Sequence, residues 1–214
     1  MSLKGAVLPV TPLQQNCTLL WDEAAKRASV IDPGGDVDRI VAALDELGVV
    51  AERILLTHGH IDHAGGAAAL AERLGLPVWG PGVEDRFLLE GLEAQGRVYG
   101  IAEARNLVPD RWLAEGDTVP IAGRDFAVLH CPGHTPGHLV YVSREARVAL
   151  VGDVLFRGSI GRTDFPYGDS AALIEAIRAK LFPLGDDIAF ICGHGPGGSL
   201  GEERRSNPFV GEQA

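Results

Sequence analysis

The chain has 214 residues, of which 46% are hydrophobic and 22% are charged. This composition is typical of one globular domain that can bury a substantial core. The formal net charge of −10 argues against nucleic acid and anionic membrane surfaces as partners, and we expect neither.

Cysteine use and the chain's start favour a reducing compartment. The three cysteines, Cys17, Cys131 and Cys192, form no Cys-x-x-Cys pair, and their odd number argues against a disulfide framework. The first residues lack the basic and apolar regions of a secretory signal, and no apolar run is long enough to span a bilayer. These features predict a cytoplasmic protein.

The first part of the chain mixes strand and helix patterns. Strands are predicted over residues 6–10, 16–21, 28–31 and 54–56, with a turn at 22–26. A helical stripe over 37–47 ends at Gly48, and a second helix, after residue 63, ends at Gly75. Together they predict an antiparallel start followed by a β-α-β-α passage.

The second part returns to strands. A short strand at 77–79 and a helix over 83–98 precede residues 99–117, which we expect to form a variable loop over a site. Further strands are predicted over 118–121, 124–130, 139–143, 147–151 and 188–192, with a helix over 170–182. Two blocks of strands, each followed by helix, predict an α/β (α+β) fold of two packed mixed sheets with helices outside.

The most informative stretch is Thr-His-Gly-His-Ile-Asp-His at 57–63, between a buried strand and a helix. Side chains alternate along an extended segment, so His58 and His60 point to the same side and can reach one metal ion. Asp62 and His63 follow after the chain turns and can face a second ion. Imidazole and carboxylate ligands suit zinc, iron or manganese.

Three further ligand-type residues repeat this placement. His134, Asp153 and His194 each follow a predicted strand, within turns rich in glycine or proline. Such turns allow backbone and ligand to approach closely. The repeated strand-end position indicates that these side chains join the cluster at 57–63.

The order His58-x-His60-x-Asp62-His63, then His134, Asp153 and His194, resembles that of the metallo-β-lactamase superfamily. Within it, Gly-Arg-Thr-Asp-Phe at 161–165 is similar to the glyoxalase II group, in particular its short bacterial members. The resemblance covers nearly the whole chain. It implies a four-layer αββα sandwich, formed by residues 1–214 as a single domain without the C-terminal helical domain that contacts glutathione.

The resemblance also implies the ligand sets of two divalent metal ions, with zinc expected first and iron or manganese as alternatives. One ion takes His58, His60 and His134; the other takes Asp62, His63 and His194; Asp153 bridges them. In this arrangement Asp62 and Asp153 hold and orient a nucleophilic hydroxide shared by the ions. An aspartate rather than a cysteine at 153 favours a bridged pair of hard-ligand ions.

Three residues have two interpretations each. His138, four residues beyond His134, can orient a metal ligand or serve as a structural histidine. Asp32 can form a turn or hydrogen-bond a ligand histidine. Arg162, within the 161–165 motif, can bind an anionic substrate or form a surface ion pair.

The implied activity is hydrolysis of a small thioester, S-D-lactoylglutathione or a related glutathione thioester. One alternative is a glutathione persulfide dioxygenase that binds a single iron through His58, His134 and Asp153. Hydrolysis of a lactone or β-lactam on the same two ions is another. A homologue that binds metal without turnover is the least expected, because every ligand position is filled.

Overall fold

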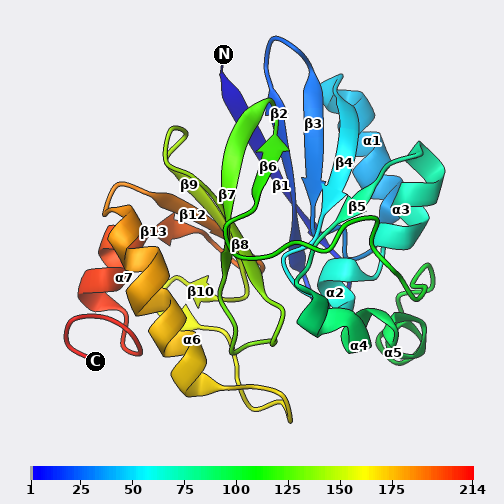
Figure 1. The fold of residues 1–214 in the computed structure, drawn as a ribbon. Helices are drawn as coiled ribbons and strands as arrows, with labels where there is room; N and C mark the ends of the chain where they lie inside the picture. Colours follow the sequence, from blue (N-terminus) through cyan, green and yellow to red (C-terminus); the bar gives the residue numbers. More distant parts are fainter. Residues whose placement is uncertain (1) are drawn as a thin grey trace.

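Two mixed sheets face each other at the centre of the molecule, with helices on their outer faces (Figure 1). This computed structural model describes residues 2–214. The first sheet has the order β1-β2-β3-β4-β5, and the second has the order β13-β12-β9-β8-β7-β6. The predicted α/β fold with two mixed sheets and outer helices is confirmed.

The first sheet comes from the N-terminal half of the chain. Its strands are β1 (Leu3–Val10), β2 (Gln15–Asp22), β3 (Arg27–Ile31), β4 (Val50–Leu55) and β5 (Val78–Trp79). Its helices are α1 (Val37–Leu47), α2 (Ile61–Ala64), α3 (Ala67–Leu74), α4 (Arg86–Leu89) and α5 (Leu92–Tyr99). Helix α1 ends as predicted, because Gly48 adopts the left-handed conformation and its N–H caps the carbonyls of the last turn.

The second sheet comes from the C-terminal half. Its strands are β6 (Thr118–Ile121), β7 (Arg124–His130), β8 (Leu139–Ser143), β9 (Val148–Gly152), β12 (Ala189–Cys192) and β13 (Gly198–Ser199). Its helices are α6 (Ser170–Ala176), which continues as irregular helical turns to Leu184, and α7 (Leu200–Ser206). The strands β10 (Leu155–Phe156) and β11 (Ser159–Ile160) form a separate hairpin.

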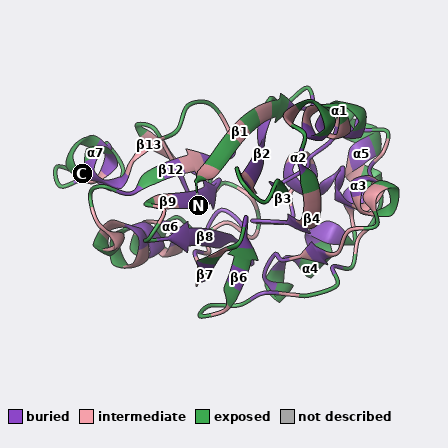
Figure 2. Ribbon diagram, turned by 90° about the horizontal axis from the view of Figure 1, so that it is seen from above, coloured by how far each residue is buried: buried purple, intermediate pink, exposed green. Residues whose placement is uncertain are grey.

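Three clusters of buried apolar side chains hold these layers together. Figure 2 colours the ribbon by the burial of each residue. Helix α1 buries Ile40 and Leu44 against the first sheet, and α6 buries Leu173 against the second. Between the sheets lies a third cluster that includes Leu55 and Phe126. Side chains are buried on both faces of each sheet, which is the burial pattern of a four-layer sandwich.

Strand direction brings several strand ends to one edge of the molecule. Strands β3, β4 and β5 run parallel. In the second sheet β7 and β9 are both antiparallel to β8, and β12 runs parallel to β9, so β7, β9 and β12 share one direction. The segments after β4, β7, β9 and β12 therefore emerge together, at the lower edge in Figure 1.

One predicted helix differs in the structure, and the chain after Gly195, for which no element was predicted, contains a strand and a helix. The helix expected over 83–98 is broken into a 3-10 turn (Val83–Asp85), α4 and α5, with an interruption at Glu90 and Gly91. The polar tail after Gly195 contains β13 and the short helix α7, whose first turn Ser199 caps through its hydroxyl. Both differences arise where local composition is ambiguous and tertiary packing decides the conformation.

The three cysteines, Cys17, Cys131 and Cys192, are buried and free. Within residues 2–214, no helix combines the length and apolar character that a membrane crossing requires.

Candidate metal centre

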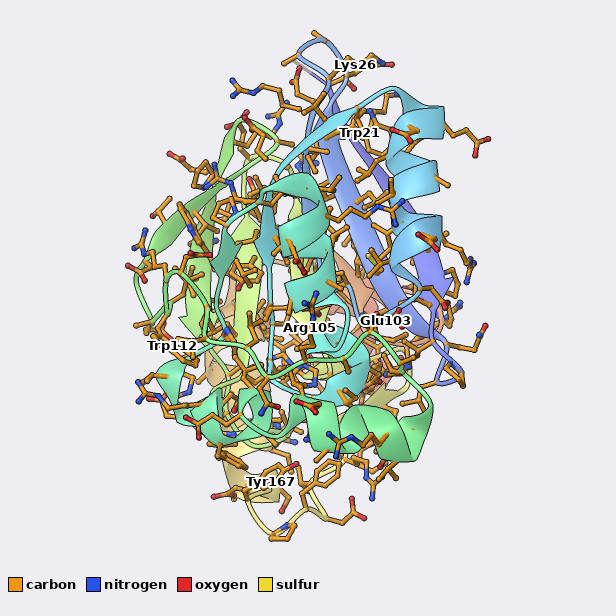
Figure 3. The ribbon with its side chains drawn as sticks, turned by 90° about the vertical axis from the view of Figure 1, so that its right-hand side faces the viewer. Trp21, Lys26, Glu103, Arg105, Trp112 and Tyr167 are labelled. Atoms are coloured by element: carbon orange, nitrogen blue, oxygen red, sulfur yellow. The ribbon has the colours of Figure 1, made fainter. Side chains whose placement is uncertain are left out.

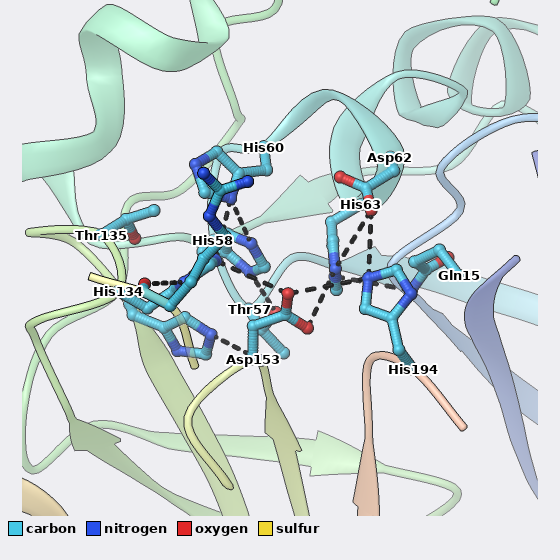
Figure 4. A network of polar contacts seen from close by, with 12 residues as sticks. Gln15, Thr57, His58, His60, Asp62, His63, His134, Thr135, Asp153 and His194 are labelled. Carbon is cyan, nitrogen blue, oxygen red and sulfur yellow. Dashed lines mark hydrogen bonds and ion pairs between the residues drawn. The ribbon is translucent and has the colours of Figure 1, made fainter. Parts of the chain in front are cut away.

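Three histidines from both halves of the molecule meet at the lower edge; we call His58, His60 and His134 the triple-histidine group (Figure 4). His58 and His60 follow β4, and His134 follows β7. Nδ1 of His60 lies 3.1 Å from Nε2 of His58 and 2.9 Å from Nε2 of His134. The extended segment 58–60 thus directs both of its imidazoles to one point, as alternation predicts.

The other ring nitrogens of this group are engaged away from the centre. Nδ1 of His134 donates to the Arg162 carbonyl at 2.8 Å. Nδ1 of His58 lies 3.0 Å from the Thr57 hydroxyl, which donates its own hydrogen to Asp32 and so accepts from the ring. Both Nε2 atoms are left with lone pairs that face His60 Nδ1, which can carry at most one hydrogen. A cation satisfies all three nitrogens.

A second cluster, the mixed group, consists of Asp62, His63 and His194. Asp62 and His63 lie in α2, and His194 follows β12. Oδ2 of Asp62 is 3.1 Å from Nε2 of His194 and 3.9 Å from Nε2 of His63. One carboxylate and two imidazoles therefore converge on a second point.

Asp153, directly after β9, lies between the two groups (Figure 4). Its Oδ2 is 3.5 Å from Nε2 of His134 and 3.6 Å from Nε2 of His194, while Oδ1 is 3.3 Å from Nε2 of His63. The close packing requires Gly193, because a Cβ there would come within 2.0 Å of Asp153 Oδ1. The carboxylate therefore faces both groups at once.

The pKa values differ between the two groups. Burial lowers the pKa of His58 well below its usual value and that of His60 to about 3, and neighbouring imidazoles add to the effect. Burial also lowers the pKa of His63, but the carboxylates of Asp153, Asp62 and Asp32 outweigh it and raise that pKa well above its usual value. The imidazoles of the triple-histidine group are thus neutral, whereas in the mixed group the nearby carboxylates favour the protonated form of His63.

The carboxylates of the centre remain ionised. Burial raises the pKa of Asp153, but the imidazoles of His63, His134 and His194 outweigh it and hold the pKa well below its usual value. The pKa of Asp62 is also lowered, since His63 and His194 outweigh its burial. Ionised carboxylates are in the state that binds a metal ion, whereas an ion in the mixed group would displace the protons that the raised pKa values of His63 and His194 favour.

Asp32 supports both groups, since it hydrogen-bonds His63 directly and contacts His58 through the Thr57 hydroxyl. Its Oδ2 accepts from Nδ1 of His63 at 2.9 Å and from the Thr57 hydroxyl at 2.7 Å, and its Oδ1 accepts from the Thr57 N–H at 2.7 Å. It does so with a left-handed φ of 53°. An acceptor behind a metal-ligating imidazole orients the ring and fixes its tautomer.

His138 lies under the triple-histidine group. Its ring stacks on His58 with centroids 4.5 Å apart, and its Nε2 accepts the backbone N–H of Asp153 at 3.0 Å. The pKa of this buried imidazole is lowered well below its usual value by burial and by the nearby histidines, so it is a neutral acceptor. It holds the backbone of Asp153 in place.

Beside the centre opens a cleft of about 650 Å³. Besides residues of both groups it is lined by the following side chains: Leu13, Ile61, Gln95, Tyr99, Phe156, Arg157, Ser159, Ile160, Arg162, Phe165, Tyr167 and Pro196. Arg162 pairs with Asp164 at 2.7 Å and lies over the Phe165 ring at 4.5 Å. The centre is therefore reachable by a small molecule, past an aromatic wall and two arginines.

Sequence reasoning did not identify Thr57, Tyr167 or Asp85. Tyr167 places its hydroxyl 2.9 Å from Nε2 of His60 and stacks on Phe165. Asp85 accepts hydrogen bonds from the segments on both sides of the triple-histidine group. Thr57 and Tyr167 lie next to sequence motifs, and this position could have indicated a role in the site. Asp85 lies within a charged stretch that shows no motif.

The donor atoms fit metal ions on two observations. Nε2 of His63 and Oδ1 of Asp153 are buried, lie 3.3 Å from each other and face the centre, and neither has a well-aligned hydrogen-bond partner in residues 2–214. The outward hydrogen bonds of His58, His63 and His134 end on a hydroxyl, a carboxylate and a carbonyl, the partners found behind metal-ligating histidines.

Comparison with protein families matches residues 10–194 to the metallo-beta-lactamase superfamily. Among curated proteins, hydroxyacylglutathione hydrolase GloC of Haemophilus influenzae is 47% identical over 97% of this chain and 98% of that protein.

Solved structures give the same result. The BLEG-1 B3 metallo-beta-lactamase superposes with a TM-score of 0.88 and 33% identity, covering 97% of this chain and 99% of that one. TTHA1623, solved in a di-iron-bound form, superposes with a TM-score of 0.85 and 38% identity, covering 96% and 100%.

Proposed function

Since the chain belongs to the metallo-β-lactamase superfamily, we propose that it is a metal-dependent hydrolase that cleaves a thioester, S-D-lactoylglutathione or a related glutathione thioester. The observation that carries the proposal is the position of Asp153 between two ligand groups beside an open cleft. The name of the 47% identical relative, hydroxyacylglutathione hydrolase, supports the substrate class.

The triple-histidine group would hold one divalent ion and the mixed group the other, with Asp153 between them. Two such ions lower the pKa of a bound water toward neutrality and polarise the substrate carbonyl. We propose zinc for both, with iron or manganese as alternatives; the di-iron form of the 38% identical TTHA1623 makes iron the first of these to test.

The chain's own carboxylates orient the attacking water. Asp62 and Asp153 stay ionised, because the surrounding imidazoles lower their pKa values, so each can accept a hydrogen bond from the water at neutral pH.

The nearby thiols of Cys131 and Cys192 do not compete with the water as nucleophiles. Burial raises the pKa of Cys131 to about 12 and that of Cys192 to about 11. The thiolate that a thioester substrate releases is a good leaving group, so its departure needs little help from a general acid.

The arginines of the cleft suit an anionic substrate. Arg162 already pairs with Asp164, which reduces its charge toward a ligand. Arg157, at the tip of the β10–β11 hairpin, lines the same cleft and has no ion-pair partner among residues 2–214. A glutathione carboxylate is the kind of group that an unpaired guanidinium binds.

A second candidate, β-lactam hydrolysis, is supported by the similarity to the BLEG-1 B3 metallo-beta-lactamase. Both reactions need a carbonyl beside a water held by two ions, so substrate turnover decides between them. Persulfide oxidation through His58, His134 and Asp153 would need a single iron.

Elemental analysis of protein purified without added metal, followed by turnover assays, tests the proposal. About two zinc, manganese or iron ions per chain, with hydrolysis of S-D-lactoylglutathione, would support it. Two ions with turnover of a β-lactam alone would favour the second candidate. One iron per chain with oxygen consumption on glutathione persulfide would refute hydrolysis.

A further inference from the structure

Asp85 is a buried carboxylate that belongs to neither ligand group. It closes the 3-10 turn after β5, and its exposed fraction is 0%. Its Oδ2 accepts from the Gly59 N–H at 2.8 Å and from the Thr135 hydroxyl at 2.7 Å, and its Oδ1 accepts from the Gly137 N–H at 2.6 Å. All three partners are donors.

These donors belong to the two segments that supply the triple-histidine group. Gly59 stands between His58 and His60, in the N-terminal half, and Thr135 directly follows His134, in the C-terminal half. One carboxylate therefore joins both segments. The Gly82 N–H adds a second link between the halves by donating to the Gly137 carbonyl at 2.9 Å.

Gly59 and Gly137 lie too close to the turn that carries Asp85 for either residue to have a side chain. A Cβ at Gly137 would lie 2.7 Å from Asp85 N and 2.8 Å from Asp85 Oδ1, and one at Gly59 would lie 3.3 Å from Asp85 Cβ. Both glycines therefore pack directly against Asp85 and its neighbours Gly82 and Leu88, and the Asp85 carboxylate bonds both segments.

The same carboxylate is one residue from His138. Gly137, which donates to Asp85, directly precedes His138, whose ring stacks on His58 and whose Nε2 accepts the Asp153 N–H. The mixed group is held differently: His63 is oriented by Asp32, and Asp85 makes no hydrogen bond to Asp62, His63 or His194 within residues 2–214.

Three donors around one side chain call for an acceptor-only group. A carboxylate offers about four lone-pair sites, whereas an asparagine of the same size replaces one oxygen with an NH₂ group that would face a donor. Such charge-assisted hydrogen bonds also offset the cost of burying the charge. A packing role alone would be met by a neutral side chain of the same volume.

We propose that Asp85 is a positioning residue that sets the geometry of the triple-histidine group, by fixing the segment of His58 and His60 against the segment of His134, and that it makes no direct contact with the mixed group. The inference rests on the metal-binding roles in the proposed function.

The test is a zinc titration of metal-free protein against a chromophoric chelator, which resolves two binding equivalents. In Asp85→Asn we expect one equivalent to weaken about tenfold or more, as loss of an outer hydrogen-bond partner does, while the other keeps its affinity. An Asp85→Asn protein that binds both equivalents like the wild type, or loses affinity equally at both, would overturn the proposal.

Asp22→Asn is the matched control. Asp22 is also buried and accepts two backbone N–H groups, from Ala24 and Ala25, at 3.0 and 2.7 Å. It lies in the turn that contains Lys26, at the opposite end of the molecule from Tyr167 (Figure 3). Both zinc affinities should stay at wild-type values in this variant; weakening of one equivalent there as well would mean that the effect is not specific to Asp85.

A His134→Ala background identifies the affected equivalent. This variant should retain one zinc ion, in the mixed group, and adding Asp85→Asn should not change its affinity; a further loss would overturn the proposed selectivity. Two tightly bound ions in His134→Ala, or fewer than two in the wild type, would instead refute the ligand sets of the proposed function, and the inference with them.

Thr135→Val guards against an Asp85→Asn protein that fails to fold, which circular dichroism would reveal. It removes one donor to Asp85 while keeping the side-chain shape. The same single equivalent should weaken, by less than in Asp85→Asn. Unchanged affinity at both equivalents in a folded Thr135→Val protein would count against the proposal.

Discussion

The triple-histidine group and the mixed group lie side by side but differ in charge and in the residues that support their histidines. The imidazoles of the first are neutral and are supported by a hydroxyl, a carbonyl and a stacked histidine. The second contains a carboxylate, and the carboxylate of Asp32 stands behind His63. The difference teaches that two ions so close together would meet unequal donors, so each group should respond separately to changes in its support.

The largest expected effect comes from Asp153→Asn, because Asp153 is the residue that faces both groups. Removing its charge should lower hydrolysis by more than the 10–100-fold that loss of an outer-shell partner costs, and reduce metal content at both groups. Turnover and elemental analysis measure this. Wild-type metal loading and rate would show that the groups do not share Asp153.

Removing one ligand from each group should separate the two. His134→Ala and His194→Ala should each bind one ion instead of two, because each leaves the other ligand set complete. Parallel zinc titrations of the two variants measure the remaining affinities. Loss of both ions in either variant would show that the groups bind cooperatively as one unit.

Asp32→Asn should weaken both groups rather than one, since Asp32 supports His63 directly and His58 through Thr57. We expect both affinities to fall, by roughly 10–100-fold at the mixed group, where the contact is direct. The same zinc titration measures both. A loss confined to the triple-histidine group would contradict the direct contact with His63.

Asp85 adds a pH dependence to the stability of the metal-free protein. Burial raises its pKa from 3.8 to about 6, so the folded state binds this proton more tightly than the unfolded state does. Its contribution to the free energy of unfolding is therefore full below pH 4 and declines by about 3 kcal/mol as the pH rises through 6. Denaturant unfolding of wild type and Asp85→Asn from pH 4 to 7 should show this slope in the wild type alone.

The smallest effect should come from the cleft arginines. Arg157→Ala should raise KM for glutathione thioesters up to about tenfold, and Arg162→Ala by less, because Asp164 already pairs with Arg162. Neither should change metal content. An equal rise in KM for a neutral thioester, such as one of N-acetylcysteamine, would show that the substrate's charge is not what Arg157 recognises.

Local sequence pattern carried most of the layered fold and the candidate ligands. The cluster at 57–63 is contiguous, and His134, Asp153 and His194 repeat a strand-end position that chain order alone reveals. The pattern of strands and helices predicted two packed sheets with outer helices, whereas the specific four-layer αββα architecture came from the family resemblance.

What the sequence could not reveal depends on distant contacts. The partners of Asp85 lie 26, 50 and 52 residues away along the chain, so no local pattern identifies it. The predicted helix over 83–98 breaks at Gly91, a residue of low helix propensity that separates α4 from α5. Tyr167 acquires its position only because the loop after β11 folds back over His60.

The buried cysteines have a consequence for chemical durability. The proposed thioester hydrolysis would release a free thiol, and the disulfide formed by oxidation of that thiol would exchange with any accessible thiolate of the enzyme. Burial keeps Cys131 and Cys192 protonated, with pKa values of about 12 and about 11, and raises the pKa of Cys17 far above its usual range. If the proposed thioester hydrolysis is its reaction, the protein would thereby be protected from forming mixed disulfides with the oxidised form of the released thiol.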